Sequence, residues 1–466
     1  MKQRYALPLA AALIVSACAD DLSQPDFQAK GRVAHAVVDN ARYIVAFNHP
    51  NLHERVAALG GVVEFKHDGA GLAVVSGLSD AAAAQLARTS GVLDVMADLE
   101  IQGTTPRSID ELLGADFAPA SITNPAGALR HNLQWNMRAV SAPQAWAAGK
   151  LGSEDVVVAI LDSGLDYEQS DFVGKVDFAT SRSFVPGDDA LLPLIGIGSK
   201  HPIMDLNAHG TNVAVQAVSN GNIYAGVSSR SRLMILKVLG WNGSGATSGI
   251  LQGVLHAADN GADVINMSIG YRNGVDRQGG FGHFVQFVNR AFNYAQREGV
   301  VVVVAAGNDA ADMDHDGPVY RALCDAPHVV CVSATGPASA TGSVDALSSY
   351  SNFGRSQISV AAPGGTNFGW VYSLCARYSL WPVPGTSQVS LGCYHPAGYY
   401  GIGFAGTSQA APHVAGLAAL LVSEMGKNSP ARIKHAIESS ADDLGQPGTD
   451  PQYGKGRINV ARALGL

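Results

Sequence analysis

Residues 156–164, Val-Val-Val-Ala-Ile-Leu-Asp-Ser-Gly, set the fold of this chain. The apolar residues predict a strand buried on both faces, and Asp-Ser-Gly predicts a turn at its carboxyl end. Similar apolar runs alternate with helical stretches at residues 233–239, 264–269, 300–306, 329–333 and 358–361. Because apolar strands that alternate with helices indicate a mostly parallel sheet covered by helices, we expect an α/β fold.

Polar side chains follow two of these runs and begin two predicted helices. Asp162 follows the first run directly, and Asn308 follows the run that ends at residue 306. Reactive groups gather at the carboxyl ends of strands in such sheets. His209 opens His-Gly-Thr ahead of an apolar helical stretch. Ser408 lies in Gly-Thr-Ser-Gln-Ala-Ala-Pro-His, residues 406–413, where a helix is predicted over residues 409–425.

These four residues supply the parts that acyl transfer requires. Ser408 is the candidate nucleophile, His209 the base and Asp162 the group that orients the base. The Asn308 amide is the candidate donor to the oxyanion. Each residue alone has a plainer interpretation, such as a turn for Asp162 and Asn308 or a helix N-cap for Ser408. Because all four occur together and beside glycines, we favour a catalytic role over these plainer interpretations.

A second Gly-Thr-Ser-Gln, at residues 385–388, repeats the start of the serine motif. It lacks the Ala-Ala-Pro-His continuation and a following helix, so we interpret Ser387 as a loop residue. His413 lies off the helical face of Ser408, and we interpret it as a structural residue rather than a catalytic one.

The chain order Asp, His, Ser is that of subtilisin, and it differs from the orders of chymotrypsin and the α/β-hydrolases. On these motifs the chain from about Trp135 to its C-terminus resembles a subtilisin-like serine protease, a member of the subtilase family. The resemblance implies a three-layer fold with a mostly parallel sheet. It also implies a serine endopeptidase that acts on protein or peptide substrates and requires no cofactor.

The resemblance further implies extended backbone segments that bind a substrate strand beside the cleft. In this sequence the segments are Gly243, Ser244 and Gly245, then Ser268, Ile269 and Gly270, with Ala305 and Gly307 lining the primary specificity pocket.

Three residues depart from the family's usual pattern. The His-Gly-Thr motif usually continues with His-Val-Ala-Gly, whereas this chain has Asn212 and Val215. Gln409 stands directly after the serine, where many subtilases carry a methionine. Since glutamine does not form a sulfoxide, we predict relative resistance to peroxide.

The N-terminus has the composition of an export signal. Residues 1–18 combine a basic start, an apolar core and small residues. Val15-Ser16-Ala17-Cys18 resembles a bacterial lipobox, which implies lipidation at Cys18; ordinary signal cleavage is the alternative. We therefore expect a protein exported from a bacterial cell, secreted or lipid-anchored, whose only membrane contact is that anchor. Residues 19–40 are interpreted as a tether.

Residues 41–102 predict a compact α+β unit with the element order β-α-β-β-α-β. Directly upstream of a protease-like domain, this unit resembles the inhibitor-type propeptide of subtilases, so we expect it to act as an intramolecular inhibitor. A permanent accessory domain is the alternative. Residues 103–130 are interpreted as a connector, where processing is expected, and residues 131–466 as the catalytic domain.

The cysteines fit an oxidising compartment. Besides Cys18, the chain has Cys324, Cys331, Cys375 and Cys393, which allow three pairings. We favour the sequence-local scheme, in which Cys324 pairs with Cys331 and Cys375 pairs with Cys393. Buried free thiols are the alternative.

Charge and acidic motifs bear on other ligands. The net charge of −8 leaves no basic footprint, so we expect no nucleic-acid partner. Residues 312–317, Asp-Met-Asp-His-Asp-Gly, imitate the start of a calcium loop, but Leu323 stands where its glutamate is expected. A calcium-clamped loop and a solvated acidic turn are both open. Asp171 matches the family's carboxylate for another calcium, and that site is left open too; we name no metal ligand.

Two rival functions remain at this point. The first is a catalytically silent subtilase-like binding protein at the cell envelope. The second is an esterase or transpeptidase on the same scaffold, because the constellation serves any acyl transfer.

Overall fold

The computed structural model describes residues 42–103, 122–271, 274–276, 284–317, 319–320, 323–382, 389–391, 401–427 and 429–466. The predicted signal, the lipidation of Cys18 and the tether lie outside the described residues, as do Ser387 and Cys393. Among the described residues, we find no helix long and apolar enough to cross a bilayer.

The N-terminal unit is a four-stranded antiparallel sheet covered by two helices, with the strand order β2-β3-β1-β4. Its elements are β1 (Arg42–Phe47), α1 (Leu52–Ala58), β2 (Val62–His67), β3 (Leu72–Ser76), α2 (Asp80–Ala87) and β4 (Val92–Ala97). The order matches the predicted β-α-β-β-α-β pattern. Ser79 caps α2, because its side chain accepts a hydrogen bond from the Ala82 amide. Alternate residues of β1, such as Val45, form a small core of their own.

The main sheet carries the predicted apolar runs. Its strand order is β16-β15-β13-β10-β6-β8-β7, with β17 paired to β15. All of these pairs are parallel except that between β15 and β16. The strands are β6 (Val157–Asp162), β7 (Arg182–Ser183), β8 (Arg232–Lys237), β10 (Val264–Met267), β13 (Val301–Ala305), β15 (Val330–Gly336), β16 (Ala346–Leu347) and β17 (Val360–Pro363).

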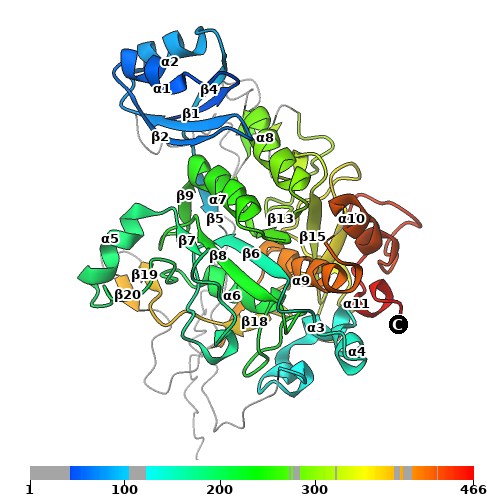
Figure 1. Cartoon of the computed structure of the whole chain (residues 1–466). Coiled ribbons are helices and arrows are strands. Elements are labelled where there is room, and N and C mark those ends of the chain that lie inside the picture. The colour runs from blue at the N-terminus through cyan, green and yellow to red at the C-terminus, as the bar shows by residue number, and fades with distance from the viewer. Residues whose placement is uncertain are drawn as a thin grey trace, which may run out of the picture. The chain divides into compact units, whose positions relative to one another are not determined.

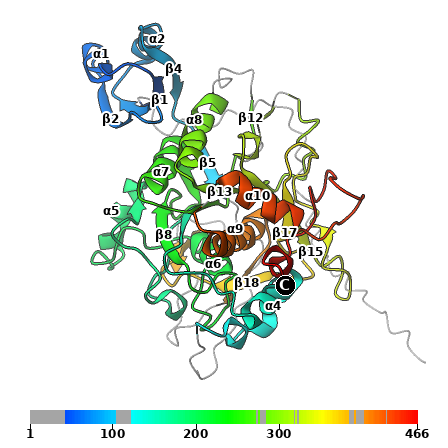
Figure 2. The ribbon, with the colours of Figure 1, turned by 45° about the vertical axis from the view of Figure 1, so that its right-hand side comes forward.

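Helices cover both faces of this sheet, which makes three layers (Figures 1 and 2). Helices α6 (His209–Ala217) and α9 (Thr407–Met425) lie on one face, and α7 (Thr247–Asp259) and α8 (Phe284–Arg297) on the other. Strand β6 shows why its sequence is apolar throughout: Val158 and Ile160 belong to the core on the α9 side, and Ala159 and Leu161 to the core on the α7 side. The predicted α/β class with a mostly parallel sheet is confirmed.

Smaller elements surround the layers. The remaining helices are η1 (Pro125–Gly127), η2 (His131–Leu133), α3 (Trp135–Ala139), α4 (Ala142–Ala147), η3 (Ser170–Phe172), α5 (Pro186–Leu194), η4 (Leu323–Asp325), α10 (Pro430–Ser439) and α11 (Val460–Ala463). The remaining strands are β5 (Glu100–Gly103), β9 (Ser244–Ala246), β11 (Ile269–Gly270), β12 (Val275–Asp276), β14 (Val319–Tyr320), β18 (Val371–Leu374), β19 (Leu380–Pro382), β20 (Val389–Leu391) and β21 (Gly401–Phe404).

The structure describes both ends of the predicted connector. Gly103 is the last residue of β5, and η1 lies within the predicted range. The Leu129 amide donates to the backbone oxygen of Asn222, and Ala128 is buried in the core of the α9 side. The end of the predicted connector therefore packs as part of the main body.

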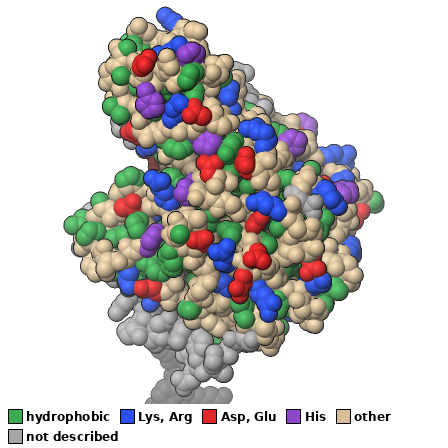
Figure 3. Space-filling view, viewed as in Figure 1, with side chains coloured by type: hydrophobic (Ala, Val, Ile, Leu, Met, Phe, Trp, Pro, Cys, Tyr) green, Lys and Arg blue, Asp and Glu red, His purple; other side chains and the backbone are tan. Residues whose placement is uncertain are grey.

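On the surface that Figure 3 shows, acidic and basic side chains are interspersed.

Candidate active site

Asp162 and His209 form a buried pair between the sheet and α6. Asp162 is the last residue of β6, and His209 is the first residue of α6. Nδ1 of His209 lies 2.7 Å from Oδ1 of Asp162, and both side chains are almost fully buried. The same carboxylate oxygen accepts from the Ser163 amide at 2.7 Å. This contact fixes the histidine tautomer that leaves Nε2 able to accept a proton.

Two glycines permit the close approach of these turns. A Cβ at Gly210 would lie 2.2 Å from the backbone oxygen of Gly164, so the turn after Asp162 touches the start of α6. Gly164 also has φ of +108°, a conformation that other residues rarely adopt. The glycines of the Asp-Ser-Gly and His-Gly-Thr motifs are therefore packing requirements.

The charge around His209 is set by two carboxylates. Burial alone lowers the pKa of His209, but the charge and hydrogen bond of Asp162 and the charge of Asp205 raise it by more, so the net direction is upward. A low-dielectric surrounding strengthens these interactions. His209 is therefore a stronger base than an exposed histidine.

Ser408 is the second residue of α9, because the helix begins at Thr407, two residues before the predicted start at residue 409. Its Oγ donates to the backbone oxygen of Ser268 at 3.1 Å, and the Ser268 hydroxyl donates back to the Ser408 oxygen at 2.8 Å. Nδ2 of Asn266 donates to the same Ser268 hydroxyl at 3.0 Å. These bonds fix the start of α9 against the end of β10.

The starts of α6 and α9 are held together by side chains next to His209 and Ser408. Nε2 of Gln409 donates to Oδ1 of Asn212 at 3.4 Å. The ring of Phe404, at the end of β21, lies edge-on to the His209 ring with 6.0 Å between centroids. The fold thus brings the predicted nucleophile and base onto two packed helix starts.

Asn308 follows β13 and lies beside the start of α9. Its Oδ1 accepts from the Thr407 amide at 2.9 Å and from the Thr407 hydroxyl at 3.0 Å. The Thr407 hydroxyl in turn accepts from the Gly307 amide at 3.0 Å. Because both bonds to Asn308 use the carbonyl side of the amide, its NH₂ group is held in a fixed direction, as an oxyanion donor requires.

The predicted substrate-binding segments are extended edges that already pair with a strand of this chain. β5 runs antiparallel between β9 and β11. Ile101 is opposite Gly245, and Gly103 is opposite Ile269. A Cβ at Gly245 would lie 2.0 Å from the oxygen of Val238, so this edge needs glycine. Gly243 forms the turn before β9, with φ of +76°. Both segments can therefore bind an extended backbone.

His413 lies behind the candidate site in a buried polar network. Its Nδ1 donates to the oxygen of Gln409 at 2.7 Å, and its Nε2 accepts from Nδ2 of Asn136 at 2.8 Å. Burial lowers its pKa to about 4. A neutral histidine with both ring nitrogens engaged is a structural residue.

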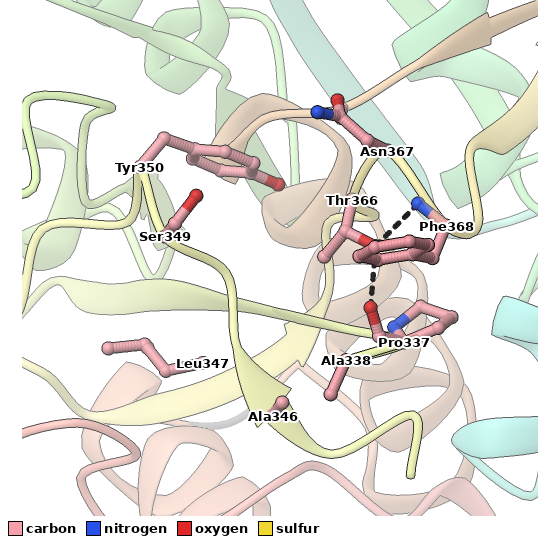
Figure 4. Close-up of a pocket in the computed structure, with 10 residues that line it drawn as sticks. Pro337, Ala338, Ala346, Leu347, Ser349, Tyr350, Thr366, Asn367 and Phe368 are labelled. Atoms are coloured by element: carbon pink, nitrogen blue, oxygen red, sulfur yellow. Dashed lines mark hydrogen bonds between the residues drawn. The ribbon is translucent and has the colours of Figure 1, made fainter. Parts of the chain in front are cut away.

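A pocket of about 310 Å³ opens beside the strand that leads to Ser408 (Figure 4). Ala405 forms part of its wall, and Tyr350 lines it and donates to the Gly365 oxygen at 2.7 Å. The hydroxyl of Thr366 donates to Pro337 at 2.7 Å and accepts from the Phe368 amide, which holds the loop in place. The other lining residues are Ala338, Ala346, Leu347, Ser349 and Asn367.

Sequence reasoning missed three buried polar residues around the pair. Asp205 and Lys237 have no exposed side-chain surface, and Ser163 is equally buried. Nζ of Lys237 donates to the backbone oxygens of Ser163 and Met204 and pairs with Asp188 at 2.8 Å. Lys237 at the end of the apolar run could have indicated a buried polar network, because charged residues are rarely buried without partners.

Asp171 does not fit a calcium site. Its oxygens accept from the Ser219 hydroxyl at 2.9 Å and from the amides of Ile223 and Tyr224 at 3.0–3.1 Å. Ser170 donates to the second oxygen at 3.2 Å. Calcium requires oxygen ligands around it, whereas hydrogen-bond donors converge on this carboxylate.

The acidic loop at residues 312–317 is also closed by hydrogen bonds. Asp314 accepts from the amides of Arg355 and Ser356 and from the Ser356 hydroxyl. Asp312 accepts from the Asp314 amide and contacts Nδ1 of His315 at 2.8 Å. Within the described part of the chain there is no group of three or more His, Cys, Asp or Glu side chains placed to hold a metal. These contacts favour the acidic turn over a calcium clamp.

Cys324 and Cys331 form a disulfide with an S–S distance of 2.05 Å. It joins η4 to β15 beside Ala305, whose oxygen lies 3.7 Å from the Cys324 sulfur. Cys375 is disulfide-bonded as well. Its predicted partner, Cys393, lies outside the described residues, so that pairing stays a prediction.

The candidate site has the aspartate on β6, the histidine on α6 and the serine on α9 of a parallel sheet with helices on both faces. The chain order Asp, His, Ser is that of subtilisin, so the site defines a serine hydrolase of the subtilisin class. A family model described as the subtilase family, peptidase S8, matches residues 153–456. The chain belongs to this family, and it is a subtilisin-like serine endopeptidase by class.

Curated relatives agree with this assignment. The chain is 34% identical over 323 residues to a thermophilic serine proteinase of Bacillus sp. (strain AK1), covering 69% of this chain and 64% of that relative. It is 31% identical over 334 residues to thermitase of Thermoactinomyces vulgaris, covering 71% of this chain and 95% of thermitase.

Two solved structures share the fold over most of this chain. The superposition with fervidolysin from Fervidobacterium pennivorans covers 94% of this chain and 62% of fervidolysin, with a TM-score of 0.68 and 21% identity. The epidermin leader peptide processing protease from Staphylococcus aureus covers 91% of this chain and 97% of its own, with a TM-score of 0.67 and 22% identity.

Proposed function

We propose that this chain is an exported serine endopeptidase, made as an inhibited zymogen, in which Asp162, His209 and Ser408 act as the catalytic triad. Ser408 Oγ attacks the peptide carbonyl carbon while His209 Nε2 takes the hydroxyl proton. Asp162 orients the imidazole and stabilises the imidazolium. His209 then gives the proton to the leaving amine, and a water molecule activated by His209 hydrolyses the acyl-enzyme.

The tetrahedral intermediate needs donors for its oxyanion. We assign this role to the NH₂ group of Asn308 and the backbone amide of Ser408. The fixed Asn308 amide and the position of Ser408 in the first turn of α9 support the assignment, because a helix N-terminus also favours negative charge.

The observation that carries the proposal is the 2.7 Å contact between Asp162 and His209, on a helix start packed against the one that holds Ser408. A turn aspartate and a helix-capping serine do not by themselves produce such a pair. A silent relative is disfavoured because each part of the machinery is present.

The pairing of β5 supports the zymogen. Gly103 is opposite Ile269, one residue from Ser268, whose oxygen accepts from the Ser408 hydroxyl. The carboxyl end of β5 thus lies close to the proposed nucleophile, in the manner of a bound substrate strand. Ile101, in the middle of β5, is fully buried in the core of the α7 side. We therefore propose residues 41–102 as the propeptide, with processing between residues 103 and 130.

The export signal at residues 1–18 and lipidation of Cys18 are part of the same proposal. They rest on the sequence pattern, and they place the enzyme outside the cytoplasm, where its disulfides persist.

The test compares the full-length wild type with Ser408→Ala. The wild type is expected to digest casein, to react with a fluorophosphonate probe and to shorten itself to a form that starts within residues 103–130. The variant should keep its full length after the signal and do none of these. Mass spectrometry of the purified protein reports the new N-terminus and any lipid on Cys18. Casein digestion by the alanine variant would refute the triad, and turnover of small esters without casein digestion would favour the esterase.

A further inference from the structure

Asp205 is a fully buried carboxylate in the loop that leads into α6, and it accepts five hydrogen bonds. Oδ1 accepts from the Ser163 hydroxyl and from the amides of Asn207 and Ala208, each at 2.9 Å. Oδ2 accepts from the Thr211 amide at 2.9 Å and from the Thr211 hydroxyl at 2.6 Å.

These bonds connect the two turns that carry the catalytic pair. Ser163 is the residue after Asp162, and its hydroxyl also accepts from the Gly210 amide at 2.8 Å. Ala208 and Gly210 are the residues on either side of His209. The Asp205 carboxylate thus binds Ser163, the neighbour of Asp162, and Ala208, the residue before His209. It is connected to Gly210, the residue after His209, through the Ser163 hydroxyl.

The start of α6 needs this support. Ala208 has φ of +89°, a left-handed conformation that costs a residue with a Cβ free energy. Ala208 has no side chain that can cap the helix, and Asp205 accepts from the Ala208 amide and from the first-turn amide of Thr211 instead. Removing the carboxylate would leave several buried amides without an acceptor.

We infer that Asp205 is a positioning residue of the proposed active site: its carboxylate holds His209 in register with Asp162. This inference rests on the proposed function, because it concerns the base of that reaction. The charge of Asp205 also stabilises the imidazolium that forms when His209 accepts the proton of Ser408.

Two carboxylates act on the charge of His209. Asp162 contacts it directly, Asp205 adds a second negative charge, and both raise its pKa against the effect of burial. The nearby cation Lys237 on β8 is bound to the oxygens of Ser163 and Met204 and is paired with Asp188. Loss of the Asp205 charge therefore lowers the pKa of His209.

The experiment measures kcat, KM and the pH dependence of fluorophosphonate labelling for three full-chain variants. Asp205→Asn removes the charge, and Ser163→Ala removes the bond to the Asp162 side but keeps the charge. Asp155→Asn is the matched control, because that aspartate is exposed. Thermal unfolding verifies that each variant folds.

For Asp205→Asn we expect kcat to fall by roughly tenfold or more with KM nearly unchanged, since misplacing the base affects the transition state. The acid limb of the labelling profile should move to lower pH. Ser163→Ala should lower kcat without moving the acid limb, and Asp155→Asn should behave like the wild type.

A folded Asp205→Asn variant with wild-type kcat and an unmoved acid limb overturns the inference. If Asp205→Asn does not fold, Ser163→Ala and Thr211→Val decide: wild-type kcat in both overturns it, and a lowered kcat in both with an unmoved acid limb supports it. A wild-type protein that neither reacts with the probe nor digests casein refutes the proposed function itself, which is a distinguishable outcome.

Discussion

Gln409 and Asn212 contact each other, with Nε2 of the glutamine donating to Oδ1 of the asparagine at 3.4 Å. These are two of the positions at which the sequence departs from the usual subtilase pattern. Both side chains are buried, one beside the proposed nucleophile and the other one turn after the proposed base. The two departures thus meet in one contact that joins α6 to α9.

The first prediction concerns oxidation at this contact. Wild-type activity should survive millimolar peroxide, because an amide does not follow the oxidation path of a thioether. Gln409→Met should lose activity rapidly under the same treatment and should also lose the bond to Asn212. Residual activity against time in peroxide measures the inactivation rates of the wild type and the variant. Equal rates of inactivation for the two proteins would contradict the prediction.

The second prediction concerns the oxyanion donor. Asn308→Ala should lower kcat with little change in KM, because the amide is needed only when negative charge develops. The loss known for such a donor in a subtilisin is about 10²–10³, and we adopt that magnitude. Steady-state kinetics on a peptide substrate measure it. Asn308→Asp, of nearly the same shape, is the control for packing, and it should be equally impaired because it offers no NH₂ donor.

The third prediction concerns pH. His209 must be neutral to accept a proton, so activity falls as the pH drops through its pKa. Because the two carboxylates raise this pKa above the ordinary 6.5, the acid limb should have its midpoint above pH 6.5. The pH profile of kcat/KM reports it directly. A midpoint well below 6.5 would mean that burial dominates over the charges.

The fourth prediction concerns Asp171 and calcium. Because hydrogen-bond donors satisfy the Asp171 carboxylate, its loop needs no cation. In the Ser408→Ala background, which prevents self-digestion, Asp171→Ala should lower stability by about 2–4 kcal/mol through its orphaned buried donors. Thermal unfolding measures the loss, and added calcium should not restore it.

The same carboxylate has a pH signature. Desolvation raises the pKa of Asp171 to about 6, against an ordinary value of 3.8. Folding therefore favours its protonated form, so its contribution to stability is complete below about pH 4 and declines as the pH rises through 6. An alanine variant should lose this part of the pH dependence of unfolding.

Local sequence patterns were sufficient for the elements that carry the chemistry. The run of apolar residues before Asp162 predicted a buried strand, and the small-residue stretch after Ser408 predicted a helix, because hydrophobic periodicity reports burial directly. The order of the motifs then predicted the family and the fold. Asp205 escaped this reasoning, since a single aspartate in a loop has no periodic signal.

The sequence by itself determined which residues end the strands and begin the helices, because those features depend on neighbours a few positions away. Only the tertiary structure decided how the ends meet. Ser163 binds Asp205, and Lys237 binds the oxygens of Ser163 and Met204. Gly103 pairs with Ile269. Each of these contacts joins residues that are at least 33 positions apart in the sequence. The same packing brought amides rather than cation ligands to Asp171. Such contacts depend on the relative placement of whole layers, which local composition does not encode.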